Sequence, residues 1–443
     1  MAKPYQPTPE DVAKAEQRRL KKEQANLNLA PKTDDEPSAI LPREWLEISI
    51  SSQTANTSGQ MIRLMTWNLL AQSLVRRELF PTSDCLKAGQ REHMIYKEIN
   101  SLKATICCLQ EVDRTEKLFP QLEKAGYAWV YAAGPRKKHG CLIAYRKDAY
   151  QCVRQKVVAY DDQEVRSEGD GQARRGSSFR TKNIGSLVAL RRLQGDDGII
   201  IATTHLFWHP AYTYERARQA GILLREVTSF RKEGTVVEEH WPCVLAGDFN
   251  FGPDDPAYSL LVGNELLPVQ KARIQSSRVV HATIDPSVST SGAAVAEEEE
   301  EGAELGENDP DRITVNARAA QPSDGLLSDA ELKGLFRQSG TPTSAYDAGQ
   351  RLYPSAGEHT FGSRVPIPEG RCGAFEPIYT SYTHYWQAVL DYIFILDAPG
   401  SEVSVVRLAK PYSKESFGEG LPRKGICGSD HISLAADLHW PTV

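Results

Sequence analysis

The 443-residue sequence has no run of 18 apolar residues, the length that a transmembrane helix needs. It also has no Cys-x-x-Cys pair, and no leucine-rich repeat lies in its first 60 residues. Its composition of 40% hydrophobic and 25% charged residues excludes a fibrous or wholly disordered chain. The length suits one large catalytic domain or two ordinary ones, and we expect no association with a membrane.

The sequence contains eight cysteines, and several lie inside apolar runs, such as Cys107 and Cys108 in Ala104–Leu109. With no secretory leader visible, this placement favours reduced thiols in the core of an intracellular protein. The first residues mix basic side chains with acidic ones such as Glu10 and Asp11, whereas mitochondrial transit peptides are poor in acids. The expected location is the cytoplasm, with the nucleus second and the mitochondrion less favoured.

The formal net charge is −6, but the acidic residues are unevenly placed. Residues 281–325 hold eleven Asp and Glu and two Arg, a local net of −9 that leaves +3 for the rest of the chain. This nearly neutral remainder is compatible with an anionic substrate and does not by itself indicate one.

Three regions of the chain differ in composition. Residues 1–60 lack apolar periodicity and are expected to form a disordered or loosely docked N-terminal tail. Residues 61–443 are expected to form a single catalytic domain. An acidic, flexible insertion at about 275–345, which includes the run Glu297–Glu301, is expected to interrupt this domain, with a short helix at Ser328–Phe336.

From Met61 onward the apolar periodicity predicts strands and helices that interleave without strict alternation. Helices are expected at Gly89–Leu102, Thr115–Ala125 and Ala211–Arg231. Strands are expected at Ile62–Trp67, Ala104–Leu109, Tyr127–Ala132, Cys141–Arg146, Ser186–Arg191, Ile199–Thr204, Pro242–Ala246, Val389–Leu396, Val403–Leu408 and Ile432–Leu438. This order predicts an α/β fold, a four-layered sandwich of two mixed β-sheets packed face to face with helices outside.

Polar residues stand beside six of the expected strands: Asn68, Glu111, His205, Asp248 with Asn250, Asp391, and Asp430 with His431. Strand ends at one rim of a sandwich converge, and ligand sites lie outside such ends. Taken alone, each residue also has a structural interpretation, such as a turn, a helix cap or a hydrogen-bonded histidine. Their joint occurrence favours a catalytic site.

The residue types indicate the chemistry of this site. Carboxylate and amide oxygens without thiolates suit a hard ion, Mg²⁺ or Mn²⁺, rather than structural zinc. Such an ion can neutralise a phosphoryl oxygen and promote attack by water. His431 directly follows Asp430, which suggests an imidazole that a carboxylate orients near the reacting phosphate. Asp391 lies in an apolar run, where a carboxylate is costly unless it is paired.

Six motifs together resemble the endonuclease/exonuclease/phosphatase superfamily over about residues 61–443: Thr66-Trp67-Asn68, Leu109-Gln110-Glu111, Thr204-His205, Gly247-Asp248-Phe249-Asn250, Leu390-Asp391-Tyr392 and Ser429-Asp430-His431. Three longer segments are more similar to its eukaryotic RNA-exonuclease branch, which contains the deadenylases, nocturnin, angel and the fungal Ngl proteins: Trp67–Ala71, Thr203–Pro210 and Tyr382–Ile393. Because no leucine-rich N-terminal half is present, the compact Ngl-, angel- or nocturnin-like group is the better match, with the fungal Ngl-type RNA exonucleases first.

The resemblance implies a Mg²⁺-dependent 3′→5′ RNA exonuclease that releases 5′-nucleotides, with Mn²⁺ as a substitute ion. Its partners would be single-stranded RNA 3′ ends, and the chain would be monomeric or weakly associated with RNA-processing factors. Glu111 would be the main Mg²⁺ ligand with Asn68 close by, and Asp248 and Asp391 complete the expected set of metal ligands.

The resemblance also implies how the remaining residues act. Asp248 would bind or deprotonate the attacking water, with Asn250 holding the water or the phosphate. Asp391 would assist a second metal or the leaving group. His431, oriented by Asp430, would hydrogen-bond the scissile phosphate, and the same charged centre would be stabilised by His205.

Substrate contacts are expected from two further residues. The resemblance implies that Trp386 stacks on the base next to the scissile phosphate and that Pro210 covers the other face, as suits unpaired bases. A rim tryptophan packed against the core is the structural alternative for Trp386. The second functional hypothesis is a phosphatase acting on a nucleotide cofactor or an RNA-end phosphate, because this scaffold serves such substrates too. Poly(A), ribosomal RNA 3′ ends and cyclic-phosphate ends all remain open as targets.

Overall fold

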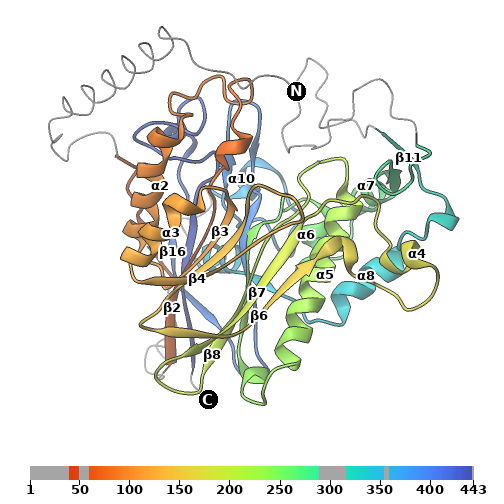
Figure 1. The fold of residues 1–443 in the computed structure, drawn as a ribbon, viewed down its shortest axis with the longest axis horizontal. Coiled ribbons are helices and arrows are strands. Elements are labelled where there is room, and N and C mark those ends of the chain that lie inside the picture. Colours follow the sequence, from red (N-terminus) through yellow and green to blue (C-terminus); the bar gives the residue numbers. More distant parts are fainter. Residues whose placement is uncertain (1–38, 49–58, 289–315, 354–358, 442–443) are drawn as a thin grey trace, which may run out of the picture. The chain divides into compact units, whose positions relative to one another are not determined.

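The computed structural model describes residues 39–48, 59–288, 316–353 and 359–441. Within these residues two large β-sheets lie face to face, and helices cover the outer face of each sheet (Figure 1). The strand order is β1-β16-β17-β2-β3-β5-β4 in the seven-stranded sheet and β12-β15-β9-β8-β7-β6 in the six-stranded sheet. The predicted α/β sandwich of two mixed sheets with helices outside is confirmed.

The seven-stranded sheet is built from β1 (Trp45–Glu47), β2 (Gly59–Asn68), β3 (Ile106–Val112), β4 (Tyr127–Ala133), β5 (Gly140–Arg146), β16 (Ser404–Ala409) and β17 (Leu434–Pro441). The six-stranded sheet is built from β6 (Tyr150–Ala159), β7 (Ile184–Arg192), β8 (Gly198–His205), β9 (Cys243–Asp248), β12 (Thr343–Ser344) and β15 (Asp391–Leu396). Two short pairs add β10 (Val279–His281) with β11 (Ala317–Ala319) and β13 (Ser381–Tyr382) with β14 (Gln387–Ala388).

The longer helices are α2 (Ala88–Leu102), α3 (Thr115–Lys124), α5 (Thr213–Lys232), α7 (Pro268–Ser276) and α8 (Asp329–Arg337). Shorter ones are α4 (Gly171–Arg175), α6 (Pro256–Leu261), α9 (Ala345–Arg351) and α10 (Phe361–Arg364). The three expected long helices and all ten expected strands are present, with ends that shift by a few residues. Strand β6 is absent from the sequence-based prediction because it is an edge strand with polar residues at four of its ten positions, and a bulge near Cys152 interrupts its alternation.

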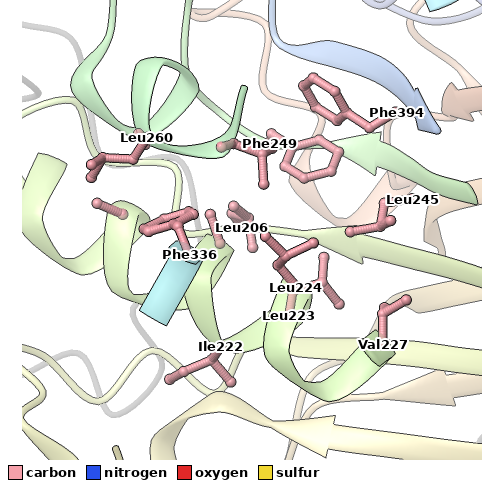
Figure 2. Close-up of a cluster of buried hydrophobic side chains, with 14 of the residues drawn as sticks. Leu206, Ile222, Leu223, Leu224, Val227, Leu245, Phe249, Leu260, Phe336 and Phe394 are labelled. Carbon is pink, nitrogen blue, oxygen red and sulfur yellow. The ribbon is translucent and has the colours of Figure 1, made fainter. Parts of the chain in front are cut away.

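The alternation of side chains along each strand builds three apolar layers. In β2, Ile62 and Leu64 point into the core between the two sheets, whereas Met65 and Trp67 pack against α2 and α3. On the six-stranded sheet, the outer face packs against α5 and its neighbours. Figure 2 shows this cluster, in which side chains of α5 meet residues of β9 and β15: Leu223, Leu224, Val227, Leu245 and Phe394.

Two regions differ from the expected domain organisation. Residues 39–48 belong to the fold rather than to a tail, because Trp45–Glu47 pairs antiparallel with β16 and Leu46 and Ile48 are buried. Within the expected insertion, α8 confirms the short helix, and β10 pairs with β11. The run Glu297–Glu301 lies outside the described residues, so its predicted flexibility stays a prediction.

All eight cysteines are free thiols, as expected. No helix in the described part of the chain is long and apolar enough to cross a membrane.

Arg43 anchors the N-terminal strand to the rest of the sheet. Its Nε atom lies 3.5 Å from Oε1 of Glu98 on α2, and its guanidinium donates hydrogen bonds to Ser433 and to the carbonyl of Lys410. The same group lies 4.3 Å from the centre of the Tyr412 ring. The Arg43 side chain is 4% exposed, so these contacts are shielded from water.

We expect Arg43→Met to lower the free energy of unfolding by about 3 kcal/mol, because removal of one partner leaves a buried charge uncompensated. Urea titration followed by circular dichroism measures this change. The matched control is Glu47→Gln on the same strand, whose exposed ion pair with Arg407 is worth about 0.5 kcal/mol or less. Equal losses in the two variants would contradict the anchoring role of Arg43.

Candidate active site

Strand direction brings the polar residues of the six-stranded sheet to one rim. Strands β8 and β9 are parallel and therefore end together, and β15 is antiparallel to β9 and begins at that rim. The register places His205 beside Asp248, and Asp248 beside Asp391. These three residues form one row across the sheet, as the sequence predicts.

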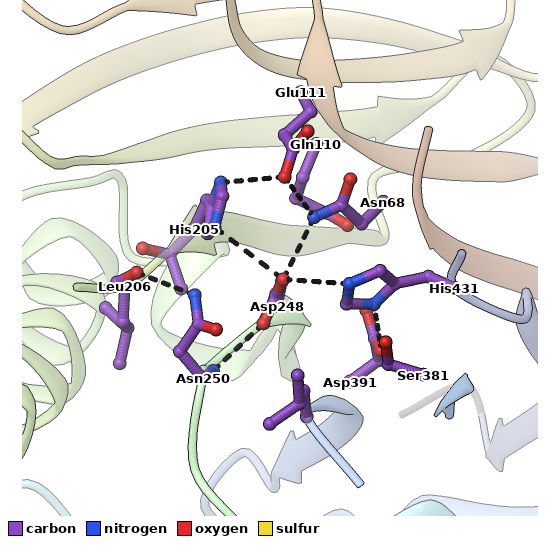
Figure 3. Close-up of polar contacts among 12 residues, drawn as sticks. Asn68, Gln110, Glu111, His205, Leu206, Asp248, Asn250, Ser381, Asp391 and His431 are labelled. Carbon is purple, nitrogen blue, oxygen red and sulfur yellow. Dashed lines mark hydrogen bonds and ion pairs between the residues drawn. The ribbon is translucent and has the colours of Figure 1, made fainter. Parts of the chain in front are cut away.

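The seven-stranded sheet supplies the other half of the site in the same way. Strands β2 and β3 are parallel and end near Asn68 and Glu111, and antiparallel β17 begins three residues after His431. Figure 3 shows the side chains from both sheets pointing toward one another. Every residue predicted at a strand end therefore lies at one rim of the sandwich.

A bulge in β3 aims Glu111 into the site. Between Leu109 and Val112 the pairing of β3 with β5 slips by one residue, which leaves Gln110 and Glu111 in the bulge. Glu111 has a φ of 54°, a left-handed conformation that costs energy for a residue other than glycine. Its carboxylate is fixed by hydrogen bonds from the backbone N–H of Ala71 (2.8 Å) and the side chain of Asn68 (2.8 Å).

Asn68 connects the two sheets at the centre of the site. Its Nδ2 atom donates to Oε1 of Glu111 on β3 and to Oδ2 of Asp248 on β9 (2.9 Å). Its Oδ1 atom accepts a hydrogen bond from the backbone N–H of Leu70, which sets the orientation of the amide. One neutral side chain thus separates two carboxylates that would otherwise face each other.

Asp248 lies between two imidazole rings. Its Oδ2 atom is 3.6 Å from Nε2 of His205 and 3.7 Å from Nε2 of His431. Burial raises the pKa of Asp248 to about 6, although both imidazoles act in the opposite direction. The backbone N–H of Asn250 donates to Oδ1 (2.9 Å), and Asn250 itself has a left-handed φ of 52°. A carboxylate with this pKa can accept a proton near neutral pH.

His431 is oriented by Asp391, which corrects the expectation that Asp430 orients it. Nδ1 of His431 is 2.8 Å from Oδ2 of Asp391, on the facing sheet. Burial alone would lower the pKa of His431, but Asp391, Asp430 and Asp248 together raise it well above its usual value. The surrounding carboxylates therefore favour the protonated, positively charged form of His431.

Asp430 points elsewhere because successive side chains leave the backbone in different directions. Burial raises the pKa of Asp430, His431 and Arg91 counteract this effect, and Glu111 adds to it. Asp430 therefore interacts with the charge of His431, whereas the hydrogen bond to the His431 ring comes from Asp391.

Arg91, which the sequence analysis does not single out, joins the loop after β2 to the segment before β17, both on the seven-stranded side of the site. It is 2% exposed, and its guanidinium donates to the carbonyls of Leu69 (2.5 Å), Leu70 (2.6 Å) and Gly428 (2.7 Å). These carbonyls follow Asn68 and precede Asp430 along the chain. An arginine in the middle of α2 has no strand-end pattern to identify it.

Trp386 and Pro210 lie on two different loops. Trp386 is half-buried in the turn between β13 and β14, where its Nε1 donates to Oγ of Ser381 (3.1 Å) and its ring meets Phe80 edge to face at 5.8 Å. It therefore precedes β15 on a short hairpin instead of leading directly into that strand. Pro210 is exposed after β8, and its carbonyl accepts a hydrogen bond from Arg216 (3.0 Å). Their contacts with a substrate stay predictions.

The family model described as the endonuclease/exonuclease/phosphatase family matches residues 65–431. The chain belongs to this family. The match begins just before Asn68 and ends at His431, so it contains the whole site. The predicted resemblance and the prediction of a hydrolytic enzyme are confirmed.

The chain is also similar to individual members of the family. A probable RNA exonuclease of Schizosaccharomyces pombe is 29% identical over 97% of this chain and 88% of its own length, and the RNA exonuclease NGL2 of Saccharomyces cerevisiae is 27% identical over the same shares. The structure of ANGEL2, described as a 2′,3′-cyclic phosphatase, aligns with a TM-score of 0.58 at 21% identity over 90% of this chain and 99% of that chain. The similarity to the ANGEL2 structure shows that the two chains share a fold.

One group of side chains in this family member could bind a metal ion. The ligand atoms of Asp248, Asp391 and His431 lie within 4.8 Å of one another, and with His431 protonated only the two carboxylates offer lone pairs. The buried Oδ1 atom of Asp391 has no hydrogen-bond partner among the described residues. Glu111 adds a further carboxylate at this rim, and its charge raises the pKa of Asp430. Oxygen donors with excess negative charge fit a hard divalent cation.

We expect Asp391→Asn to lower the pKa of His431, because the anion that stabilises the imidazolium is removed. Proton NMR titration of the metal-free protein measures the pKa of His431. Asp397→Asn, just beyond the other end of β15, is the matched control and should leave this pKa unchanged. An unchanged pKa in Asp391→Asn would show that the two groups do not form a charged pair.

Proposed function

We propose that this chain is a Mg²⁺-dependent RNA exonuclease that removes nucleotides from 3′ ends. The observation that carries the proposal is the convergence of Glu111, Asp248 and the Asp391–His431 pair at one rim, within a chain whose relatives are named RNA exonucleases. A phosphodiester hydrolase needs a base for water, a positive charge near the phosphate and a cation site. This rim supplies residues suited to each role.

Glu111 is the principal ligand for Mg²⁺ in this proposal, with Asp430 beside it. The charge of Glu111 raises the pKa of Asp430, and a divalent ion bound at Glu111 would offset this repulsion. When bound, Mg²⁺ would neutralise charge on the scissile phosphate and lower the barrier to attack. Asp391, expected among the ligands, orients His431 through one oxygen and offers its unpartnered oxygen to a second ion.

Asp248 acts as the general base in this proposal. Its pKa of about 6 leaves it ionised at neutral pH and able to take a proton from water. The backbone N–H of Asn250 fixes one carboxylate oxygen, and the other oxygen faces His205 and His431. The attacking water loses its proton to Asp248 and a bond forms between the water oxygen and phosphorus. The bond from phosphorus to the 3′ oxygen breaks, and this oxygen takes a proton from solvent to become the new 3′-hydroxyl.

In this proposal, the positive charge of His431 stabilises the negative charge of the scissile phosphate. Asp391 holds the imidazolium through Nδ1, which leaves Nε2 to donate a hydrogen bond toward the rim. Nε2 of His205 faces the same carboxylate from the other side. The phosphate gains negative charge as water attacks, so fixed donors at this position stabilise the transition state.

Incubation of purified protein with RNA labelled at its 5′ end tests the direction and the reaction class. We expect a ladder of products shortened from the 3′ end, loss of the ladder in EDTA, and recovery on addition of Mg²⁺ or Mn²⁺. A second RNA that ends in a 2′,3′-cyclic phosphate distinguishes a phosphatase from an exonuclease. Opening or removal of that phosphate without shortening would contradict the exonuclease proposal.

We expect Glu111→Gln to lower kcat by a factor of about 1,000 or more, because loss of a ligand charge removes several kcal/mol of transition-state stabilisation. Single-turnover assays give the rate, and isothermal titration calorimetry should show weaker Mg²⁺ binding. Glu92→Gln on α2 is the control, because this carboxylate pairs with Arg114. Retention of more than about a tenth of the wild-type rate by Glu111→Gln would refute the metal assignment.

We expect Trp386→Ala to weaken RNA cleavage by about 1–3 kcal/mol, the energy of one base stacked on an aromatic ring. Trp386→Phe should keep most of the activity because a π-face remains. Melting temperature is measured in parallel, since the ring also contacts Phe80. A large fall in melting temperature with normal cleavage below it would assign Trp386 to the core instead.

A further inference from the structure

Two loops rich in basic residues lie beside the active site. The loop between β4 and β5 carries Arg136, Lys137 and Lys138, and the loop that precedes β7 carries Arg180 and Lys182. Four of these side chains are exposed, and together they are called the basic surface: Arg136, Lys138, Arg180 and Lys182.

The backbones of the two loops are fitted closely together. A Cβ atom at Gly134 would lie 1.9 Å from the carbonyl oxygen of Lys182, so only glycine permits this approach. Lys182 has a left-handed φ of 58°. The carboxylate of Asp161 fixes this turn by accepting hydrogen bonds from the backbone N–H groups of Thr181 (3.0 Å) and Lys182 (2.8 Å). The basic side chains therefore stand on a rigid base.

Both loops lie next to His205. The ring of His139, at the end of the first loop, lies 6.3 Å from the ring of His205. Asn183, at the end of the second loop, donates from Nδ2 to the carbonyl of His205 (2.7 Å). The basic surface is thus continuous with the His205 side of the site.

The charge of the basic surface contrasts with that of the whole chain, which is −6. Asp161 lies under the second loop, and its two oxygens accept hydrogen bonds from backbone N–H groups of that loop. Several cations on two fitted loops beside a phosphodiester site match the spaced negative charges of a nucleic-acid backbone.

We propose that the basic surface binds the backbone phosphates of RNA on the 5′ side of the scissile bond. The proposal rests on the proposed function, because an RNA held by its 3′ end can extend from the site only in the 5′ direction. Contacts with phosphates do not depend on base sequence, so the basic surface would increase affinity for longer RNA without selecting a sequence.

The test compares two variants that each lose four exposed cations. The first carries Arg136→Ala, Lys138→Ala, Arg180→Ala and Lys182→Ala. The control carries substitutions on or at the ends of outer helices, away from both loops: Lys97→Ala, Lys103→Ala, Lys124→Ala and Lys232→Ala. Binding of a labelled RNA of about 12 nucleotides is measured in EDTA at increasing salt concentration, so that cleavage does not interfere.

We expect the basic-surface variant to bind this RNA about 10- to 100-fold more weakly at low salt, with the slope of log K against log salt reduced by about 2. The control variant should keep the wild-type slope. An unchanged slope in the basic-surface variant, or an equal change in the control, would overturn the proposal. If four substitutions lower the melting temperature, the pair Arg136→Ala and Lys138→Ala should give about half the change in slope.

A kinetic measurement separates this proposal from the proposed function. A dinucleotide has only the scissile phosphate, whereas the longer RNA adds phosphates on the 5′ side. The ratio of kcat/KM for the longer RNA to that for the dinucleotide should fall about tenfold in the basic-surface variant. An unchanged ratio would contradict the basic surface. Failure of the wild-type protein to cleave either RNA would instead refute the exonuclease, and the binding slopes would still decide the basic surface.

Discussion

Four carboxylates are buried within one rim of the sandwich, and their mutual repulsion is the constraint on which the arrangement of the site depends. Asp248 and Asp391 are at most 1% exposed, and Asp430 and Glu111 are 5% and 8% exposed. Unpaired, each would cost several kcal/mol to remove from water. Each carboxylate has a polar or charged partner. Asn68 donates hydrogen bonds to Glu111 and Asp248, and His431 pairs with Asp391. The charge of Arg91 counteracts the effect of burial on Asp430.

The two-sheet architecture makes these contacts possible. Each sheet contributes parallel strands that end at the rim and one antiparallel strand that starts there, so carboxylates and their partners arrive from opposite sides. Asn68 and Glu111 come from one sheet, whereas Asp248 and Asp391 come from the other. A change in the spacing between the sheets would alter all of these contacts at once, which relates the packing of the apolar core to the chemistry at its edge.

The sequence is sufficient to predict which strand-end residues meet at the rim, because each strand has a clear apolar pattern and a polar residue where that pattern ends. It is not sufficient to predict which residues pair. His431 follows Asp430 directly, yet its partner is Asp391, forty residues earlier, since the packing of one sheet on the other decides which side chains meet. Arg91 lies within a helix and has no strand-end pattern, and Trp45–Glu47 is only three residues long, too short for an alternating pattern.

The central claim of this account is that a divalent cation binds at the rim, at Glu111. There it would offset the charge of the buried carboxylates and promote phosphodiester hydrolysis. The most direct measurement is the anomalous scattering map of crystals soaked in Mn²⁺. The account predicts a peak in direct contact with the carboxylate of Glu111, between the two sheets. A map without a peak at the rim, or with Mn²⁺ bound only at surface carboxylates, would contradict it.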